Sequence, residues 1–261
     1  GMGTMLQAAG LKLGARPEEL NITDPALIEG IHGQYAAAGS RIVNANTFGA
    51  SAHKLAGSTY TLEQVIAAGI ANCKRACAPY GALTALDVGP LGELLEPSGT
   101  LAFEDAVAEY ARIVKAGEAA GADLIFFETY TDLYELKAAL LAARENTHLP
   151  ILASMSFEAG GRTFTGCTVE SFAATARGLG ADAVGINCSL GPKEIFPMAK
   201  RLAEAVPGNF PVFVKPNAGL PRADGSGYDI TPQLFSLQMK PYRELHLFAA
   251  GGCCGTTPEF I

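Results

Sequence analysis

The sequence contains no apolar run of about 18 residues, the length that a transmembrane helix needs, so we expect no membrane span. It has no cluster of basic residues and a net charge of −7, so nothing favours a nucleic-acid partner. The opening residues lack the basic segment and long apolar core of a secretory signal peptide. Six cysteines among 261 residues are too few for a disulfide scaffold. These absences predict a cytoplasmic protein with reduced thiols.

The composition is that of a globular protein with a large core, because 49% of the residues are hydrophobic and 17% are charged. Seven short apolar segments rich in β-formers recur along the chain. Each is almost continuously apolar, as expected of parallel strands that are covered on both faces. The predicted strands are residues 41–48, 82–89, 123–129, 150–157, 181–188, 211–216 and 245–251.

Segments with helical spacing lie between the predicted strands. Two of them open with recognisable start signals: Asp24 before Pro25, and a capping-box pattern from Thr61 to Gln64. The predicted helices are one that begins at Asp24-Pro25, one that begins at Thr61, residues 103–120, 132–144, 169–179 and 192–205, and one that begins at Thr231-Pro232.

This alternation predicts an α/β fold, a (β/α)8 TIM barrel. The first helix precedes the first visible strand, and the helix-start signal at Thr257-Pro258 has nothing behind it. We therefore expect a single barrel domain, residues 1–261, that lacks most of strand 1 and the final helix and is a fragment of a longer chain. The alternative is an open doubly wound sheet, but no G-x-G-x-x-G or Walker-type loop follows any strand. Loops 89–102 and 217–229, rich in Gly and Pro, are the predicted active-site loops.

Polar side chains gather where the predicted strands end, which is where barrel enzymes build their active sites. Cys188 ends one strand, and Cys253 and Cys254 end the last. Adjacent cysteines rarely bond to each other, whereas three thiolates suit a zinc ion and leave its fourth position open for catalysis. The alternative is that Cys253 and Cys254 only pack against the neighbouring glycines.

The other cysteines carry weaker signals. Cys73 and Cys77 share one helix face and are predicted to be buried apolar side chains. Cys167 falls at a helix start, where its pKa could be lowered, but we expect a structural role. The four histidines are scattered, so a histidine-based triad has little support. Glu128 enters the barrel mouth with no basic residue beside it in sequence. It is a candidate partner for a substrate ammonium group, and the alternative is a salt bridge to a distant Lys or Arg.

Six motifs appear in order along the chain: GMGTMLQ at 1–7, NANTFG at 44–49, FETY at 127–130, GINCSLGP at 185–192, PNAGLP at 216–221 and GGCCGTTPE at 251–259. With these motifs the chain resembles the homocysteine S-methyltransferase family. The resemblance is strongest to the N-terminal homocysteine-binding domain of the cobalamin-dependent methionine synthases. It covers nearly the full chain.

The resemblance implies an enzyme of methionine biosynthesis that transfers a methyl group to the sulfur of homocysteine. The implied catalytic zinc ligands are Cys188, Cys253 and Cys254, with the homocysteine sulfur as fourth ligand. The zinc ion would hold that sulfur as a thiolate, because a free thiol with a pKa of about 8.5 is mostly protonated at neutral pH. The implied substrate-binding residues are Glu128 for the amine, the loop of Gly1, Met2, Gly3 and Thr4 for the carboxylate, and Asn217 as a stand-in ligand when substrate is absent.

The resemblance also points to a methyl donor. The start of the chain favours methylcobalamin and methyltetrahydrofolate, with cobalamin- and folate-binding domains of the same chain as partners. The alternatives are a betaine- or S-methylmethionine-dependent methyltransferase, a zinc-stabilised scaffold without activity, and a thiol enzyme with Cys188 as covalent nucleophile. The family usually has an Asp-Gly at the end of strand 1, where the Asp aids amine binding, and this sequence begins at about that point.

Overall fold

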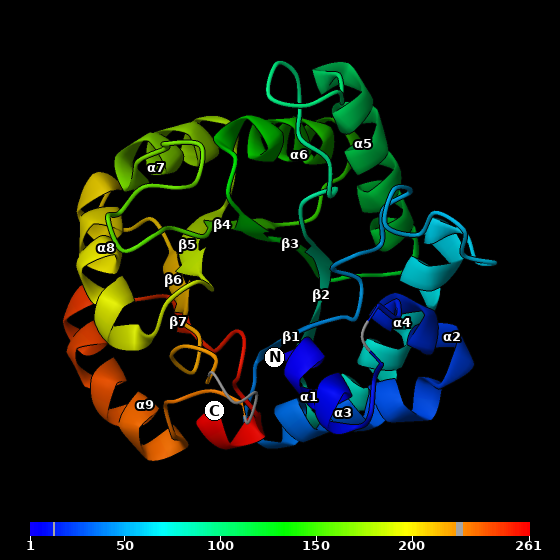
Figure 1. Ribbon diagram of the computed structural model, residues 1–261, viewed down its shortest axis with the longest axis horizontal. Helices are drawn as coiled ribbons and strands as arrows, with labels where there is room; N and C mark the ends of the chain where they lie inside the picture. Colours follow the sequence, from blue (N-terminus) through cyan, green and yellow to red (C-terminus); the bar gives the residue numbers. More distant parts are fainter. Residues whose placement is uncertain (13, 223–226) are drawn as a thin grey trace.

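The computed structural model describes all residues except 13 and 223–226. Four residues of the predicted loop 217–229 thus lie outside the described part. Seven parallel strands form one curved sheet in the sequential order β1 to β7, with the helices on its outer side (Figure 1). The strands are β1 (Ile42–Asn44), β2 (Leu83–Val88), β3 (Leu124–Tyr130), β4 (Ile151–Met155), β5 (Ala183–Asn187), β6 (Val212–Lys215) and β7 (Ala249–Ala250).

The strand order decides between the two predicted architectures. A doubly wound sheet reverses its strand order and carries helices on both faces. Here each strand pairs with the next one in sequence and the sheet curls inward, so the doubly wound alternative is wrong and the α/β barrel type is confirmed. The missing first strand and final helix remain predictions. No helix among the described residues is long and apolar enough to cross a membrane.

The predicted helices form close to their expected bounds. The main helices are α3 (Pro25–Ala37), α4 (Leu62–Cys77), α5 (Phe103–Ala119), α6 (Leu133–Asn146), α7 (Val169–Gly178), α8 (Pro192–Ala205) and α9 (Pro232–Met239). The capping box predicted at α4 is present: Gln64 N donates to Thr61 Oγ1 at 3.3 Å, and Thr61 N donates to Gln64 Oε1 at 3.0 Å. Asp24, Asp132 and Thr231 cap α3, α6 and α9 with a single hydrogen bond each, in which the side chain accepts from a backbone N–H of the first turn.

Several local predictions were wrong. Two predicted strands, 41–48 and 245–251, were too long, and β1 spans only Ile42–Asn44. The last strand is much shorter than 245–251, because the 3₁₀ helix η3 (Lys240–Leu245) and a left-handed residue, His246, precede β7. The start signal at Thr257 leads to a single 3₁₀ turn, η4 (Pro258–Phe260). Two short helices, α1 (Met2–Ala8) and α2 (Leu20–Thr23), were not predicted. They are too short for a visible period, and α1 is held by burial of its single core residue, Leu6. The remaining 3₁₀ turns are η1 (Pro17–Glu19) and η2 (Ala78–Tyr80).

Side chains on the inner face of the sheet follow the alternation of the strands. An apolar layer packs there: Ala85, Leu124, Phe126, Leu152, Ala183 and Phe213. Polar side chains follow this layer, two residues nearer the carboxyl ends of the strands: Asp87, Glu128, Ser154 and Lys215. Asn187 of β5 pairs in register with Lys215 of β6. The sheet geometry therefore gathers polar groups at one mouth of the barrel, above an apolar floor.

Candidate metal centre

Three thiols converge at this mouth. Cys188 follows β5, whereas Cys253 and Cys254 follow β7. Their Sγ atoms all lie within 4.8 Å of one another, and Cys188 Sγ is 3.7 Å from Cys254 Sγ. Tetrahedral zinc with Zn–S bonds of about 2.3 Å places its sulfur ligands about 3.8 Å apart. The spacing and the soft donors therefore fit a zinc ion, and within the described residues this is the cluster that qualifies as a metal site.

The backbone positions the three thiols through one neighbouring segment. Cys188 N donates to Lys215 O at 3.0 Å, and Cys253 N donates to Pro216 O at 2.8 Å. Cys254 N donates to the side-chain oxygen of Asn217 at 3.0 Å. These hydrogen bonds thus hold both cysteine turns against the end of β6 and the two residues after it. The side-chain oxygen of Asn217 is engaged with this amide, and its role as a stand-in ligand stays a prediction.

Backbone strain marks the Cys188 turn. Cys188 and Ser189 have φ angles of +63° and +62°, a left-handed conformation that costs a non-glycine residue about 1–3 kcal/mol. Leu190 N donates to Cys188 O at 2.8 Å, which closes the turn. The surrounding hydrogen bonds therefore hold the Cys188 thiol in a position that the free chain would avoid.

Glycines are required around the cysteine pair. Gly255 has a φ of +78°, and a Cβ atom there would lie 2.2 Å from Tyr228 Cγ. A Cβ on Gly252 would lie 2.5 Å from Thr256 Cγ2. Thr256 Oγ1 donates to Cys253 O at 2.6 Å, so it cannot move away without loosening the turn. The glycines flanking the pair thus serve the close packing of the metal centre.

Asn187 connects the thiols to the rest of the barrel, and the sequence analysis did not single it out. Its Oδ1 accepts hydrogen bonds from Thr129 N and Ser154 Oγ, both at 2.9 Å. Its Nδ2 donates to Thr129 Oγ1 at 2.8 Å and, at 3.7 Å, to Cys253 Sγ. Thr129 has a φ of +68° beside a register shift between β3 and β4. The only signal in the sequence was a buried amide directly before Cys188.

The contacts among the three thiols shift the pKa values of Cys188 and Cys254 in opposite directions. Hydrogen bonds from Cys188 and Cys253 lower the pKa of the Cys254 thiol to about 3. The same contacts raise the pKa of Cys188.

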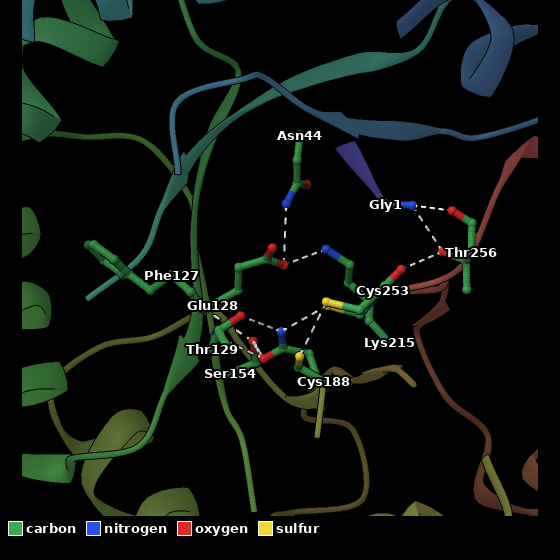
Figure 2. Close-up of polar contacts among 12 residues, drawn as sticks. Gly1, Asn44, Phe127, Glu128, Thr129, Ser154, Cys188, Lys215, Cys253 and Thr256 are labelled. Atoms are coloured by element: carbon green, nitrogen blue, oxygen red, sulfur yellow. Dashed lines mark hydrogen bonds and ion pairs between the residues drawn. The ribbon is translucent and has the colours of Figure 1, made fainter. Parts of the chain in front are cut away.

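Glu128 forms the salt bridge that was the alternative in the sequence analysis. Its Oε2 accepts from Lys215 Nζ and, at 3.4 Å, from Asn44 Nδ2 (Figure 2). The two charged side chains are only 10% and 19% exposed. Burial raises the pKa of Glu128 despite the opposing charge of Lys215. Burial lowers the pKa of Lys215, but the charges of Glu128 and Asp87 outweigh it and the net direction is upward. Lys215 ends β6 and Glu128 lies two residues before the end of β3, both on inward positions, but the sequence carried no signal that these two would pair.

Asp87 is a second buried carboxyl group at the same mouth. It is 7% exposed, and its Oδ1 has no hydrogen-bond partner among the described residues. Burial, and then the charge of Glu128, raise the pKa of Asp87 well above its usual range. Asp87, Glu128 and the three metal-site cysteines line one cavity of about 800 Å³.

The segment from Gly1 to Thr4 lines the same cavity, but it is not the predicted loop. Gly1 is the N-cap of α1, and Met2, Gly3 and Thr4 form its first turn, with Leu6 as the buried residue of the helix. Thr4 Oγ1 accepts from Gly255 N at 2.9 Å. The segment therefore lies against the cysteine turn, as a helix end, and its role toward a carboxylate stays a prediction.

The remaining cysteines lie elsewhere. Cys73 and Cys77 are buried in α4 with their Sγ atoms 3.8 Å apart, which confirms the predicted burial. Cys167 is half-buried before α7, and burial raises its pKa to about 11. A lowered pKa at this position is therefore wrong, because desolvation outweighs the neighbouring backbone N–H groups.

Comparison with known proteins shows which family this sequence matches. The model of the homocysteine S-methyltransferase family matches residues 1–261. Methionine synthase from Mycobacterium tuberculosis (strain ATCC 25618 / H37Rv) is 32% identical over 283 residues, and methionine synthase from Mycobacterium leprae (strain TN) is 33% identical over 285 residues. Each comparison covers 100% of this chain and 23% of the relative, so the chain spans less than a quarter of the length of these curated proteins.

Solved structures show the same fold. The metallated form of the homocysteine methyltransferase MmuM from Escherichia coli matches with a TM-score of 0.82 and 22% identity, over 99% of this chain and 91% of that chain. Its apo form matches with a TM-score of 0.75 and 22% identity, over 98% and 89% of the two chains.

Proposed function

Since the chain belongs to the homocysteine S-methyltransferase family, we propose that it binds zinc through Cys188, Cys253 and Cys254 and methylates the sulfur of homocysteine to give methionine. The family membership confirms the resemblance predicted from the sequence motifs. The observation that carries the proposed metal is the sulfur spacing, which matches the edge of a zinc tetrahedron. The E. coli relative described as metallated adds support.

The metal ion and the protein residues would have different roles in the reaction. A bound zinc ion would supply the acidity that keeps a substrate thiol ionised at neutral pH. Three thiolate ligands keep the site electron-rich, which favours a nucleophilic sulfur. Asn187 orients Cys253 through its amide N–H, as outer-sphere donors commonly orient metal ligands. No side chain has to act as a general base.

The remaining polar groups at the barrel mouth bind the substrate in this proposal. Glu128 accepts the ammonium group of homocysteine. The first turn of α1, from Gly1 to Thr4, receives the carboxylate. Asn217, whose side-chain oxygen accepts from Cys254 N, serves as the stand-in when substrate is absent. These roles follow the family resemblance, and the cavity lined by Glu128 and by Gly1 to Thr4 supports the first two.

The methyl donor that we propose is methylcobalamin, recharged from methyltetrahydrofolate, on other domains of a longer chain. The similarity to methionine synthases, which are about four times longer, supports this assignment over betaine or S-methylmethionine. Residues 1–261 then form one homocysteine-binding domain of a cytoplasmic enzyme. An eighth strand between β1 and β7 and a final helix would complete its barrel.

The test is metal analysis combined with methyl transfer. We expect one zinc ion per chain and transfer from methylcobalamin to homocysteine in the zinc-loaded protein. Cys254→Ala should lose both, whereas the control Cys167→Ala should keep both, because Cys167 lies outside the cavity. Full transfer by zinc-free protein would refute the proposal. Unfolding on chelation, with no transfer, would instead support a zinc-stabilised scaffold.

A further inference from the structure

Four polar side chains from different strands line the cavity at the barrel mouth: Asn44 of β1, Asp87 of β2, Glu128 of β3 and Lys215 of β6. Asp87 pairs in register with Phe126, two residues before Glu128, so both carboxyl groups lie on the inner face. Lys215 is the basic side chain that contacts Glu128 among the described residues. The cluster thus holds two carboxyl groups and one ammonium group.

The ammonium group of Lys215 forms a salt bridge with one of these carboxylates, that of Glu128. Its Nζ contacts Glu128 Oε2 and lies 4.6 Å from the centre of the Phe126 ring. Asn44 donates to the same Oε2. In the described part of the chain Glu128 Oε1 receives no hydrogen bond, so one oxygen of Glu128 is saturated and the other is open to a ligand.

Asp87 provides the second open oxygen. Most buried polar atoms in proteins have a hydrogen-bond partner, and an exception needs an explanation. Asp87 Oδ1 is buried, lacks a partner within the described residues and belongs to a side chain that lines the cavity of the metal centre. An unpaired buried carboxylate is costly, so a cationic group brought by a ligand would relieve it.

We propose that Asp87 is a specificity residue that binds the ammonium group of the substrate together with Glu128, while Lys215 occupies the other oxygen of Glu128. The inference rests on the proposed function and deepens it, since it names the groups that select an amino-acid thiol over a plain thiol. With substrate bound, two ammonium groups face two carboxylates. The sulfur of the same ligand reaches the cysteines because all of these groups line one cavity.

The test compares two ligands in the zinc-loaded protein by calorimetry. Homocysteine carries the ammonium group, and 4-mercaptobutanoic acid is the same molecule without it. Asp87→Asn keeps the shape of the side chain and removes its charge. We expect homocysteine affinity to fall by about ten- to a hundredfold, the range of a charge-assisted hydrogen bond, with unchanged affinity for the desamino ligand. The melting temperature should not fall, because the charged form of Asp87 is already disfavoured by burial and its Oδ1 makes no hydrogen bond within the described residues.

Two further variants make the result decisive. Asp105→Asn, an exposed residue of α5, is the matched control and should change neither affinity. Lys215→Met frees both carboxylates and should increase the preference for homocysteine over the desamino ligand. Equal loss of both ligands in Lys215→Met would show that Lys215 binds the carboxylate instead and would overturn its assignment. If Asp87→Asn is poorly folded, Asp87→Ser serves the same comparison.

The outcomes separate this inference from the proposed function. If the wild type binds homocysteine and Asp87→Asn binds it equally well, the inference fails alone. If Asp87→Asn weakens both ligands equally, Asp87 is structural and the inference also fails. If the wild type does not bind homocysteine at all, the proposed function fails and the inference fails with it.

Discussion

Asn187 offers the sharpest test of how the barrel supports its metal centre. The side chain is fully buried and makes three hydrogen bonds to Thr129 and Ser154 and one to Cys253. Asn187→Ala removes all four. At about 1 kcal/mol for each of the three bonds to nitrogen or oxygen, the expected loss is about 3 kcal/mol in the free energy of unfolding. For a domain of this size that lowers the melting temperature by roughly 6–12 °C.

Asn187→Asp separates stability from metal binding. A carboxylate keeps the acceptor for Thr129 N and Ser154 Oγ, but it removes the N–H donor that faces Cys253 and adds a negative charge beside the thiols. We expect zinc affinity to fall by about ten- to a hundredfold, the usual effect of losing an outer-sphere partner. Competition with a chromophoric chelator measures the affinity, and thermal unfolding followed by circular dichroism measures the stability.

A surface amide provides the control. Asn146 donates to Ala142 O at the end of α6, far from the thiols in sequence, and Asn146→Asp should leave zinc affinity unchanged. The reasoning is refuted if Asn187→Asp binds zinc as tightly as the wild type. An unchanged melting temperature in Asn187→Ala would equally show that these hydrogen bonds contribute nothing.

Three other predictions concern single side chains. Glu128→Gln should weaken homocysteine binding more than zinc binding, since Glu128 is not a metal ligand; equal loss in calorimetry and metal analysis would indicate a structural role. Gly255→Ala should lower stability by at least about 1–3 kcal/mol and reduce zinc content, because the new Cβ meets Tyr228 and φ is positive; normal unfolding and zinc content would contradict this. Burial lowers the pKa of His32 to about 4, from a usual value of 6.5. The unfolded chain then binds the extra proton first, so this residue should cost about 2 kcal/mol of stability between pH 7 and pH 5. Denaturant titrations should show that His32→Leu removes this acid-dependent loss; an unchanged pH profile would show that His32 is not its source.

The sequence was a good guide to the strands and to the convergence of the cysteines. Strands β2 to β6 were recognisable because burial on both faces makes them almost continuously apolar, whereas β1 and β7 are only partly buried. The carboxyl ends of parallel strands meet at one mouth, so Cys188 and Cys253 were expected to approach despite being far apart in sequence. This inference needed only topology.

The contacts across the barrel were beyond the sequence. Glu128 on β3 and Lys215 on β6 are separated by two strands, and their pairing depends on the curvature of the sheet and on inward register. The same holds for Asn187, whose partners come from β3, β4 and the β7 turn. The short β7 was missed because its apolar run looked like a full strand, although only Ala249 and Ala250 pair with β6.

The segment from Lys215 to Asn217 has a consequence for how this domain can vary. Its three consecutive residues hold the Cys188 turn, the Cys253 turn and the Glu128 carboxylate. A one-residue insertion or deletion here would shift the thiols and the ammonium pocket together, so no single compensating substitution could restore both. The length of this segment is thus more constrained than its composition. The loop at 89–102, predicted as an active-site loop, contributes no residue to the cavity of the metal centre, so we expect changes in its length to leave that centre in place.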